Sequence, residues 1–105
     1  MAKLCFNRKF ELVLPEEMLS LLGKSRRRAL VTFLDDHVIG IKHLESKVDE
    51  DLIVDVAYLL YRKRLPFSEE MRLHMSISPE DTIDISVVGS TMFLRKWEPN
   101  KKTDV

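Results

Sequence analysis

The chain has 105 residues, which is enough for one compact domain with its own core and too few for two domains of ordinary size. Seventeen basic and seventeen acidic side chains give a formal net charge of zero, so the overall composition does not point to a nucleic-acid partner. Apolar residues make up 45% of the chain, and no apolar run approaches the roughly 20 residues that a membrane-spanning helix needs.

The first half of the chain predicts two short strands, a helix and a hairpin. Proline suits the first turn of a helix, so Pro15 ends the second strand and opens the helix. Gly23 is suited to end that helix in a left-handed conformation. In chain order we expect a strand over 3–6, a turn over 7–9, a strand over 10–14, a helix over about 16–22 and a basic loop over 24–28.

A hairpin is predicted after the basic loop. The stretch 29–34 has strong strand propensity, and Asp35 and Asp36 interrupt it as a turn. The return strand covers 38–44, where Gly40 indicates either a bulge or a close approach of another backbone.

The second half predicts the same series of elements. Leu52 to Leu60 reads as either a strand or a helix, because its periodicity does not distinguish the two. Ser68 is suited to cap the N-terminus of the following helix, and Pro66 places the strand before it at a sheet edge or bulge. The remaining expected elements are a turn over 61–63, a strand over 64–67, a helix over 68–74, a turn over 78–81, strands over 82–87 and 91–97 joined by Gly89, and a flexible tail over 99–105.

The two halves form a predicted tandem repeat of β-β-α-β-β units, with an ungapped offset of 53 residues. The first repeat covers 1–46 and the second covers 52–98, and together they make a single domain over 1–98. The offset places apolar positions on apolar positions, as a shared core requires. It superimposes Glu16, Glu17 and Met18 on Glu69, Glu70 and Met71, Leu30 on Ile83, Ile39 on Met92, and Leu44 on Trp97.

The segment from Leu12 to Gly23 resembles the strand, proline, helix and Leu-Gly ending of the AbrB/SpoVT/MraZ family of bacterial transition-state regulators. The hairpins over 29–44 and 81–100 are similar to the closing hairpin of those domains. In that family two units exchange hairpins to form a mainly β, swapped-hairpin barrel, and MraZ-type members carry both units in one chain. The resemblance implies that this chain builds an AbrB-like barrel with short helices from its own two halves.

The resemblance also implies DNA binding through basic residues near the first turn, the second strand and the short helix. This sequence departs from that pattern in its first repeat. The family's basic position in the second strand falls at Glu11 in repeat one, and at Lys63 or Arg64 in repeat two. The paired helix arginines fall on Met18 and Leu19 in repeat one, and on Met71 and Arg72 in repeat two.

Local basic clusters are the candidate DNA contacts, because each contact between a cation and a phosphate releases counterions. The preferred set is Arg8, Lys9, Arg62, Lys63, Arg64 and Arg72, and a second set is Arg26, Arg27 and Arg28. The same clusters are also typical of solvated turns. The rival hypothesis is therefore a protein-binding module, antitoxin-like or partner-inhibiting, that uses the barrel to hold a partner protein or a further copy of the chain.

Residues for chemistry are sparse. Cys5 is the only cysteine, so an internal disulfide is excluded, and we expect it to be a small buried residue. His37, His43 and His74 have no metal-ligand spacing, and no glycine-rich phosphate loop is present. We expect no enzymatic activity, metal or cofactor. The first residues lack a signal-peptide pattern, which indicates a cytoplasmic protein without a membrane anchor.

Overall fold

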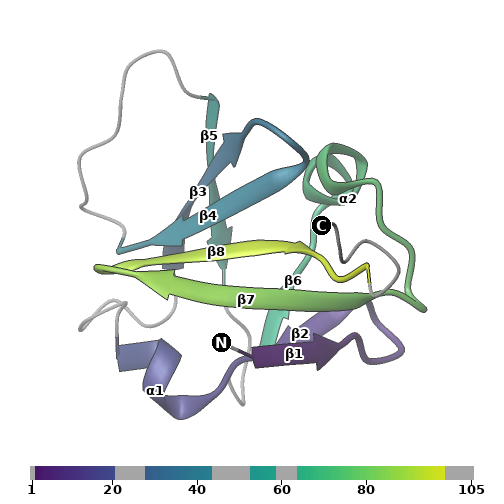
Figure 1. Cartoon of the computed structure of the whole chain (residues 1–105), viewed down its shortest axis with the longest axis horizontal. Coiled ribbons are helices and arrows are strands. Elements are labelled where there is room, and N and C mark those ends of the chain that lie inside the picture. The colour runs from purple at the N-terminus through teal and green to yellow at the C-terminus, as the bar shows by residue number, and fades with distance from the viewer. Residues whose placement is uncertain (1, 21–27, 44–52, 59–63, 99–105) are drawn as a thin grey trace, which may run out of the picture.

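The computed structural model describes residues 2–20, 28–43, 53–58 and 64–98, and these form a mainly β architecture (Figure 1). Within the described residues the strands are β1 (Ala2–Cys5), β2 (Glu11–Val13), β3 (Arg28–Leu34), β4 (Val38–Lys42), β5 (Ile53–Tyr58), β6 (Arg64–Pro66), β7 (Thr82–Val88) and β8 (Thr91–Lys96). Two short helices, α1 (Glu16–Leu19) and α2 (Glu69–Met75), complete the fold. The prediction of a mainly β chain with short helices is confirmed.

Every strand pairing among the described residues is antiparallel, and the strands form a larger and a smaller sheet. The larger sheet has the order β1-β7-β8-β4-β3-β5, and the smaller one pairs β2 with β6. The first strand of each half lies beside the closing hairpin of the other half, because β1 pairs with β7 and β5 pairs with β3. Figure 1 shows the β7–β8 hairpin next to β1, although the two are separated by most of the chain.

The pairs at the centre of both sheets join residues that are 53 positions apart. Gly40 on β4 lies opposite Phe93 on β8, and Leu12 on β2 lies opposite Leu65 on β6. Residues that hold equivalent places in the two halves therefore face each other in each sheet. This is the arrangement that an approximate twofold axis through the two pairs produces, and its spacing is the offset seen in the sequence.

The core lies between the two sheets and is built equally from both halves. On β7 the side chains of Ile83 and Ile85 are buried, whereas Asp84 between them is only half-buried. This alternation is what a strand with one face toward a core requires. Leu12 and Leu65 are also fully buried, and burial of such side chains stabilises a fold by about 1.5–3 kcal/mol each.

Gly40 leaves room for the side chain of a neighbouring strand. It pairs in register with Thr32 on β3, so no bulge is present. A Cβ atom on Gly40 would lie 2.7 Å from the Thr32 hydroxyl oxygen, closer than real Cβ atoms come to a neighbour. Both sequence-based alternatives are therefore wrong: the structure has no bulge here, and the atoms that crowd Gly40 belong to side chains and not to another backbone.

The open question about residues 52–60 is answered for 53–58, which form strand β5. This strand lies at the edge of the larger sheet, and Val54, Val56 and Tyr58 are exposed. It is therefore neither an amphipathic helix nor a fully buried strand. Residues 52, 59 and 60 lie outside the described residues.

Helix α2 has a side-chain cap at its N-terminus, whereas α1 has none. The Ser68 hydroxyl accepts a hydrogen bond from the Met71 amide at 3.3 Å, which confirms the predicted cap. Ser76 follows the helix with φ 56°, in the left-handed region. Helix α1 ends at Leu19, before the predicted 22, and the expected Gly23 cap lies outside the described residues.

The β3–β4 turn is joined to the C-terminal end of α2 by two histidines. Nε2 of His74 donates toward the carbonyl oxygens of Leu34 and Val38, which flank the turn. Nδ1 of His37 donates to the carbonyl oxygen of His74 at 2.9 Å. These contacts fasten a hairpin of the first half to a helix of the second.

Further local predictions differ from the structure, and one of them is the second strand, which covers Glu11–Val13 and not the predicted 10–14. Cys5 is exposed, so the expectation of a buried thiol is wrong; it alternates on β1 with the half-buried Leu4 and lies beside Thr82. Strand β4 ends at Lys42, before the predicted 44. The predicted tail at 99–105 lies outside the described residues, and none of the described helices is long and apolar enough to span a membrane.

Candidate nucleic-acid interface

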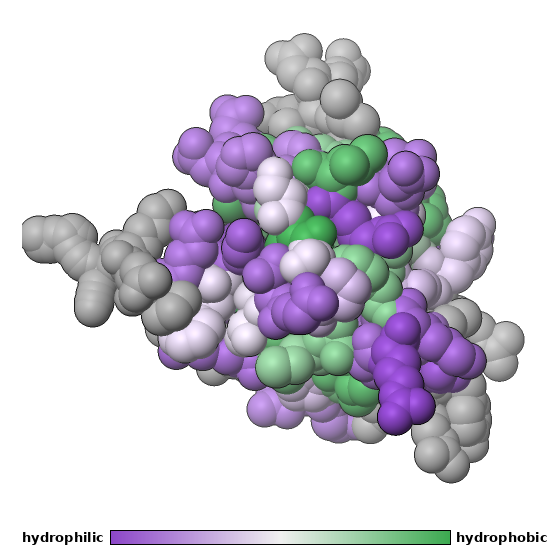
Figure 2. Space-filling model, turned by 90° about the vertical axis from the view of Figure 1, so that its right-hand side faces the viewer, coloured by the Kyte–Doolittle hydropathy of each residue, from purple (hydrophilic) through white to green (hydrophobic). Residues whose placement is uncertain are grey.

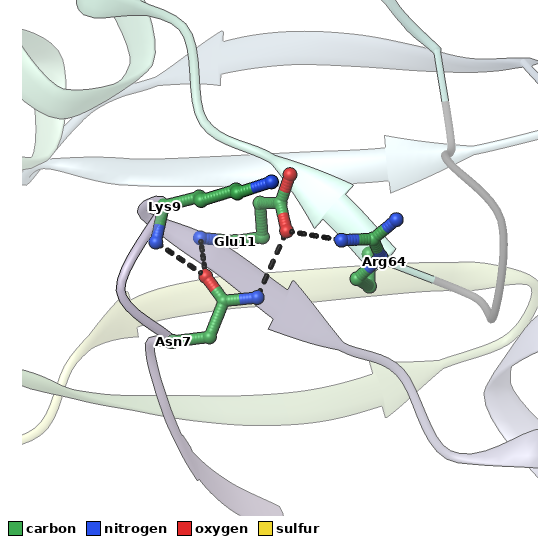
Figure 3. A network of polar contacts seen from close by, with 4 residues as sticks. All are labelled: Asn7, Lys9, Glu11 and Arg64. Carbon is green, nitrogen blue, oxygen red and sulfur yellow. Dashed lines mark hydrogen bonds and ion pairs between the residues drawn. The ribbon is translucent and has the colours of Figure 1, made fainter.

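The turn between β1 and β2 is organised by the side chain of Asn7. Its Oδ1 accepts hydrogen bonds from the backbone amides of Lys9, at 2.9 Å, and Glu11, at 3.0 Å (Figure 3). Phe10 adopts the left-handed conformation with φ 63°. Its backbone amide donates a hydrogen bond to the carbonyl oxygen of Asn7. The side chain of an asparagine thus replaces backbone partners in the turn, and Arg8 and Lys9 are left exposed at its tip.

An ion pair joins this turn to β6. Oε1 of Glu11 accepts hydrogen bonds from Nδ2 of Asn7, at 2.8 Å, and from a terminal guanidinium nitrogen of Arg64, at 3.1 Å (Figure 3). The Glu11 side chain is 5% exposed and the Arg64 side chain is 29% exposed. Because the carboxylate is close and shielded from solvent, it offsets part of the positive charge that Arg64 would present to a phosphate.

Arg72 on α2 lies over the same turn. Its guanidinium carbon is 4.9 Å from the centre of the Phe10 ring, and its Nε donates to the Ser68 carbonyl oxygen at 3.3 Å. A guanidinium over an aromatic face is attracted by the ring. The Phe67 amide also donates to the Phe10 carbonyl oxygen, so the start of α2 and the turn are held together by backbone as well as side chains.

Phenylalanines support this contact from below. The Phe6 and Phe10 rings meet edge to face at 4.5 Å between centroids, and Phe6 and Phe67 meet in the same way at 4.9 Å. Edge-to-face contacts fix the orientation of such rings. Phe10 is therefore a firm platform for Arg72.

A hollow of about 400 Å³ lies beside Arg72. Its walls include Phe10, the exposed Leu73 and the acidic Glu69. Figure 2 shows the side of the molecule that carries α2, where hydrophobic residues reach the surface in several places between hydrophilic ones. The face is thus of mixed charge and polarity.

The structure brings four of the predicted contacts to one region, namely Arg8, Lys9, Arg64 and Arg72. Arg28 is exposed at the first position of β3 in the larger sheet, opposite Tyr58 on β5. The other predicted contacts, Arg26, Arg27, Arg62 and Lys63, lie outside the described residues.

Three residues of this region were not identified from the sequence. The sequence placed Asn7 in a turn but did not identify its role. Asparagine often accepts a hydrogen bond from the backbone amide two residues later in a turn, as Asn7 does from Lys9. Phe10 and Glu11 gave no local sign of their partners, which lie in the second half of the chain.

A second feature lies beside β5, which is the last strand of the larger sheet among the described residues. A hollow of about 290 Å³ runs between β5 and the segment from β6 to α2, and its walls include Val56, Tyr58, Phe67 and Met71. An exposed sheet edge next to apolar side chains is suited to an added strand from another protein.

Comparison of the chain with protein-family models, with curated proteins and with solved structures found no match.

Proposed function

We propose that this chain is a DNA-binding transcriptional regulator of the AbrB/SpoVT/MraZ kind, non-catalytic and cytoplasmic, whose two halves form a swapped-hairpin barrel. The barrel is supported by the pairing of each half's first strand with the closing hairpin of the other half. The observation that carries the function is the placement of Arg72 over Phe10, because it unites a helix cation with the basic turn at Arg8 and Lys9.

The proposed mechanism is occupation of DNA. Arg8 and Lys9 are exposed at the tip of a turn whose backbone is held by hydrogen bonds to Asn7. The backbone therefore does not need to rearrange for these two side chains to contact phosphates. Arg72 is held by Phe10 and by the Ser68 carbonyl, which orients its remaining donors. Phosphate contacts of this kind set affinity and register, and base contacts would set the sequence preference.

The testing experiment is binding of the purified protein to mixed genomic fragments at low and near-physiological salt. Salt-sensitive retention is expected. The double variant Arg8→Ala/Lys9→Ala should bind more weakly, and the slope of log affinity against log salt should fall by about 0.9 for each lost phosphate contact. The matched control is Lys42→Ala/Arg95→Ala, which removes the same charge from the larger sheet. Equal loss in both variants, or no retention by the native protein at either salt, would contradict the proposal.

The second candidate function is binding of a protein partner, and the β5 edge favours it. Val54, Val56 and Tyr58 are exposed along a strand that, among the described residues, has a neighbour on one side only. Absence of DNA retention together with capture of an extended peptide at this edge would select this function. Replacing Val56 by lysine, which places a charge on the edge, should then abolish peptide binding.

A further inference from the structure

The ion pair between Glu11 and Arg64 joins equivalent positions of the two halves, which are 53 residues apart. The two residues flank the central pair of the smaller sheet, Leu12 opposite Leu65. Glu11 lies opposite Pro66 and Arg64 lies opposite Val13, so the two charged side chains meet diagonally across the pair of strands.

This geometry has a consequence for any pairing between like halves. If two copies of the first half met through β2, each Glu11 would take the place that Arg64 now holds, and two carboxylates would meet. Two copies of the second half would bring two Arg64 guanidiniums together. An acid facing a base is possible here only between unlike halves.

The low solvent exposure of Glu11 makes the difference in stability between unlike and like pairing large. The Glu11 side chain is 5% exposed, and one of its two hydrogen-bonding partners at Oε1 is the neutral amide of Asn7. The positive charge that balances the carboxylate therefore comes from Arg64 across the interface. A buried charge that loses its opposite partner is strongly destabilising, more so when a like charge replaces that partner.

We propose that the Glu11–Arg64 pair is a recognition element that makes the β2–β6 interface accept the opposite half of the chain and reject a like half. The partner that this surface fits is the second half of the same chain. The protein thereby closes on itself, and repeats of separate molecules do not pair like with like. This inference does not depend on DNA binding. It also accounts for an acid at the place where the resemblance to the regulator family led us to expect a base.

The test is a charge-reversal cycle in the full chain. Glu11→Arg places two guanidiniums together, Arg64→Glu places two carboxylates together, and the double variant restores an acid–base pair in the opposite sense. Each single reversal is expected to lower the melting temperature by about 10 °C or more, and the double variant should recover more than half of the summed loss. Glu11→Gln is the shape control, because its amide oxygen still accepts from Asn7 and Arg64, and its loss should be smaller than that of Glu11→Arg.

A second measurement separates recognition from stability alone. When the Glu11→Arg and Arg64→Glu chains are mixed, each half finds an opposite charge only in the other chain. A complex with the mass of two chains should then form that neither variant forms alone, measured by light scattering after size exclusion. A double variant that melts at the temperature given by adding the two single losses would overturn the inference. So would a mixture whose mass and melting temperature equal those of the separate variants.

Discussion

The two helices hold equivalent places in the two halves, but they serve different parts of the molecule. In α2 the arginine at position 72 is directed at the surface and lies over Phe10. The equivalent residue of α1, 53 positions earlier, is Leu19, which is 2% exposed and belongs to the core. The same position thus serves core packing in the first half and carries a surface cation in the second. Only the second half therefore supplies a helix arginine at this position to the candidate DNA-binding face.

The largest expected effect comes from Leu12 and Leu65, which face each other at the centre of the smaller sheet. Leu12→Ala and Leu65→Ala each remove a fully buried side chain, and each should cost about 2–5 kcal/mol of unfolding free energy. Because the two residues face each other, the losses should agree within about 1 kcal/mol, measured by denaturant unfolding. Losses that differ by more would mean that the halves do not share the axis evenly.

Gly40 and Phe93, which face each other at the centre of the larger sheet, allow a second comparison of the two halves. Gly40→Ala should cost about 1–3 kcal/mol, because the new Cβ meets the Thr32 hydroxyl at 2.7 Å. The equivalent position of the second half is Phe93, where a large side chain is accepted. Adding Thr32→Ala should recover part of the loss in thermal melting. No recovery would place the strain elsewhere.

Arg72 tests the asymmetry in function. On the proposed DNA-binding role, Arg72→Ala should weaken DNA binding up to about tenfold, which is about 1.4 kcal/mol. The reference substitution is Glu17→Ala on the exposed part of α1, which should not weaken binding. Fluorescence anisotropy at two salt concentrations measures both. If the two variants lose affinity equally, the face is not one-sided.

The helix caps carry the smallest expected effect. Ser68→Ala removes the hydroxyl that accepts the Met71 amide, and it should cost about 1 kcal/mol. Pro15 precedes α1 and makes no side-chain cap, so Pro15→Ala lacks this loss. Thermal melting of both variants measures the difference, and equal losses would show that the Ser68 bond contributes little.

Much of the fold was predictable because its signals are local. The alternation over 82–87 with Gly89 and the cap at Ser68 placed the last hairpin and α2 to within about one residue of their observed bounds. The offset of 53 relates core positions such as Leu12 with Leu65 and Ile39 with Met92. It does not hold for the predicted match of Leu30 with Ile83, because β3 buries Ala29 and Val31 and leaves Leu30 half-buried. Those signals say which elements form.

The contacts of the candidate site were not predictable in the same way. Glu11 and Arg64, like Phe10 and Arg72, are brought together by the pairing of β2 with β6, and no local pattern reports that pairing. Cys5 was wrongly expected to be buried. In so short a strand, with apolar neighbours at Leu4 and Phe6, the sequence does not show which face points toward the core. The identity of surface contacts therefore had to come from the three-dimensional arrangement.

The pairing of β1 with β7 also sets a timetable for folding. Ala2 has Ile85 as its partner, so the first strand leaves the ribosome long before the strand that completes it. At about 5–20 residues per second, that interval lasts some seconds, during which β1 has an unpaired edge. Neither half is finished before almost all of the chain has been synthesised, and such distant pairing is a general cause of slow folding. A chain built in this way completes its fold all at once, as a whole molecule, and not half by half.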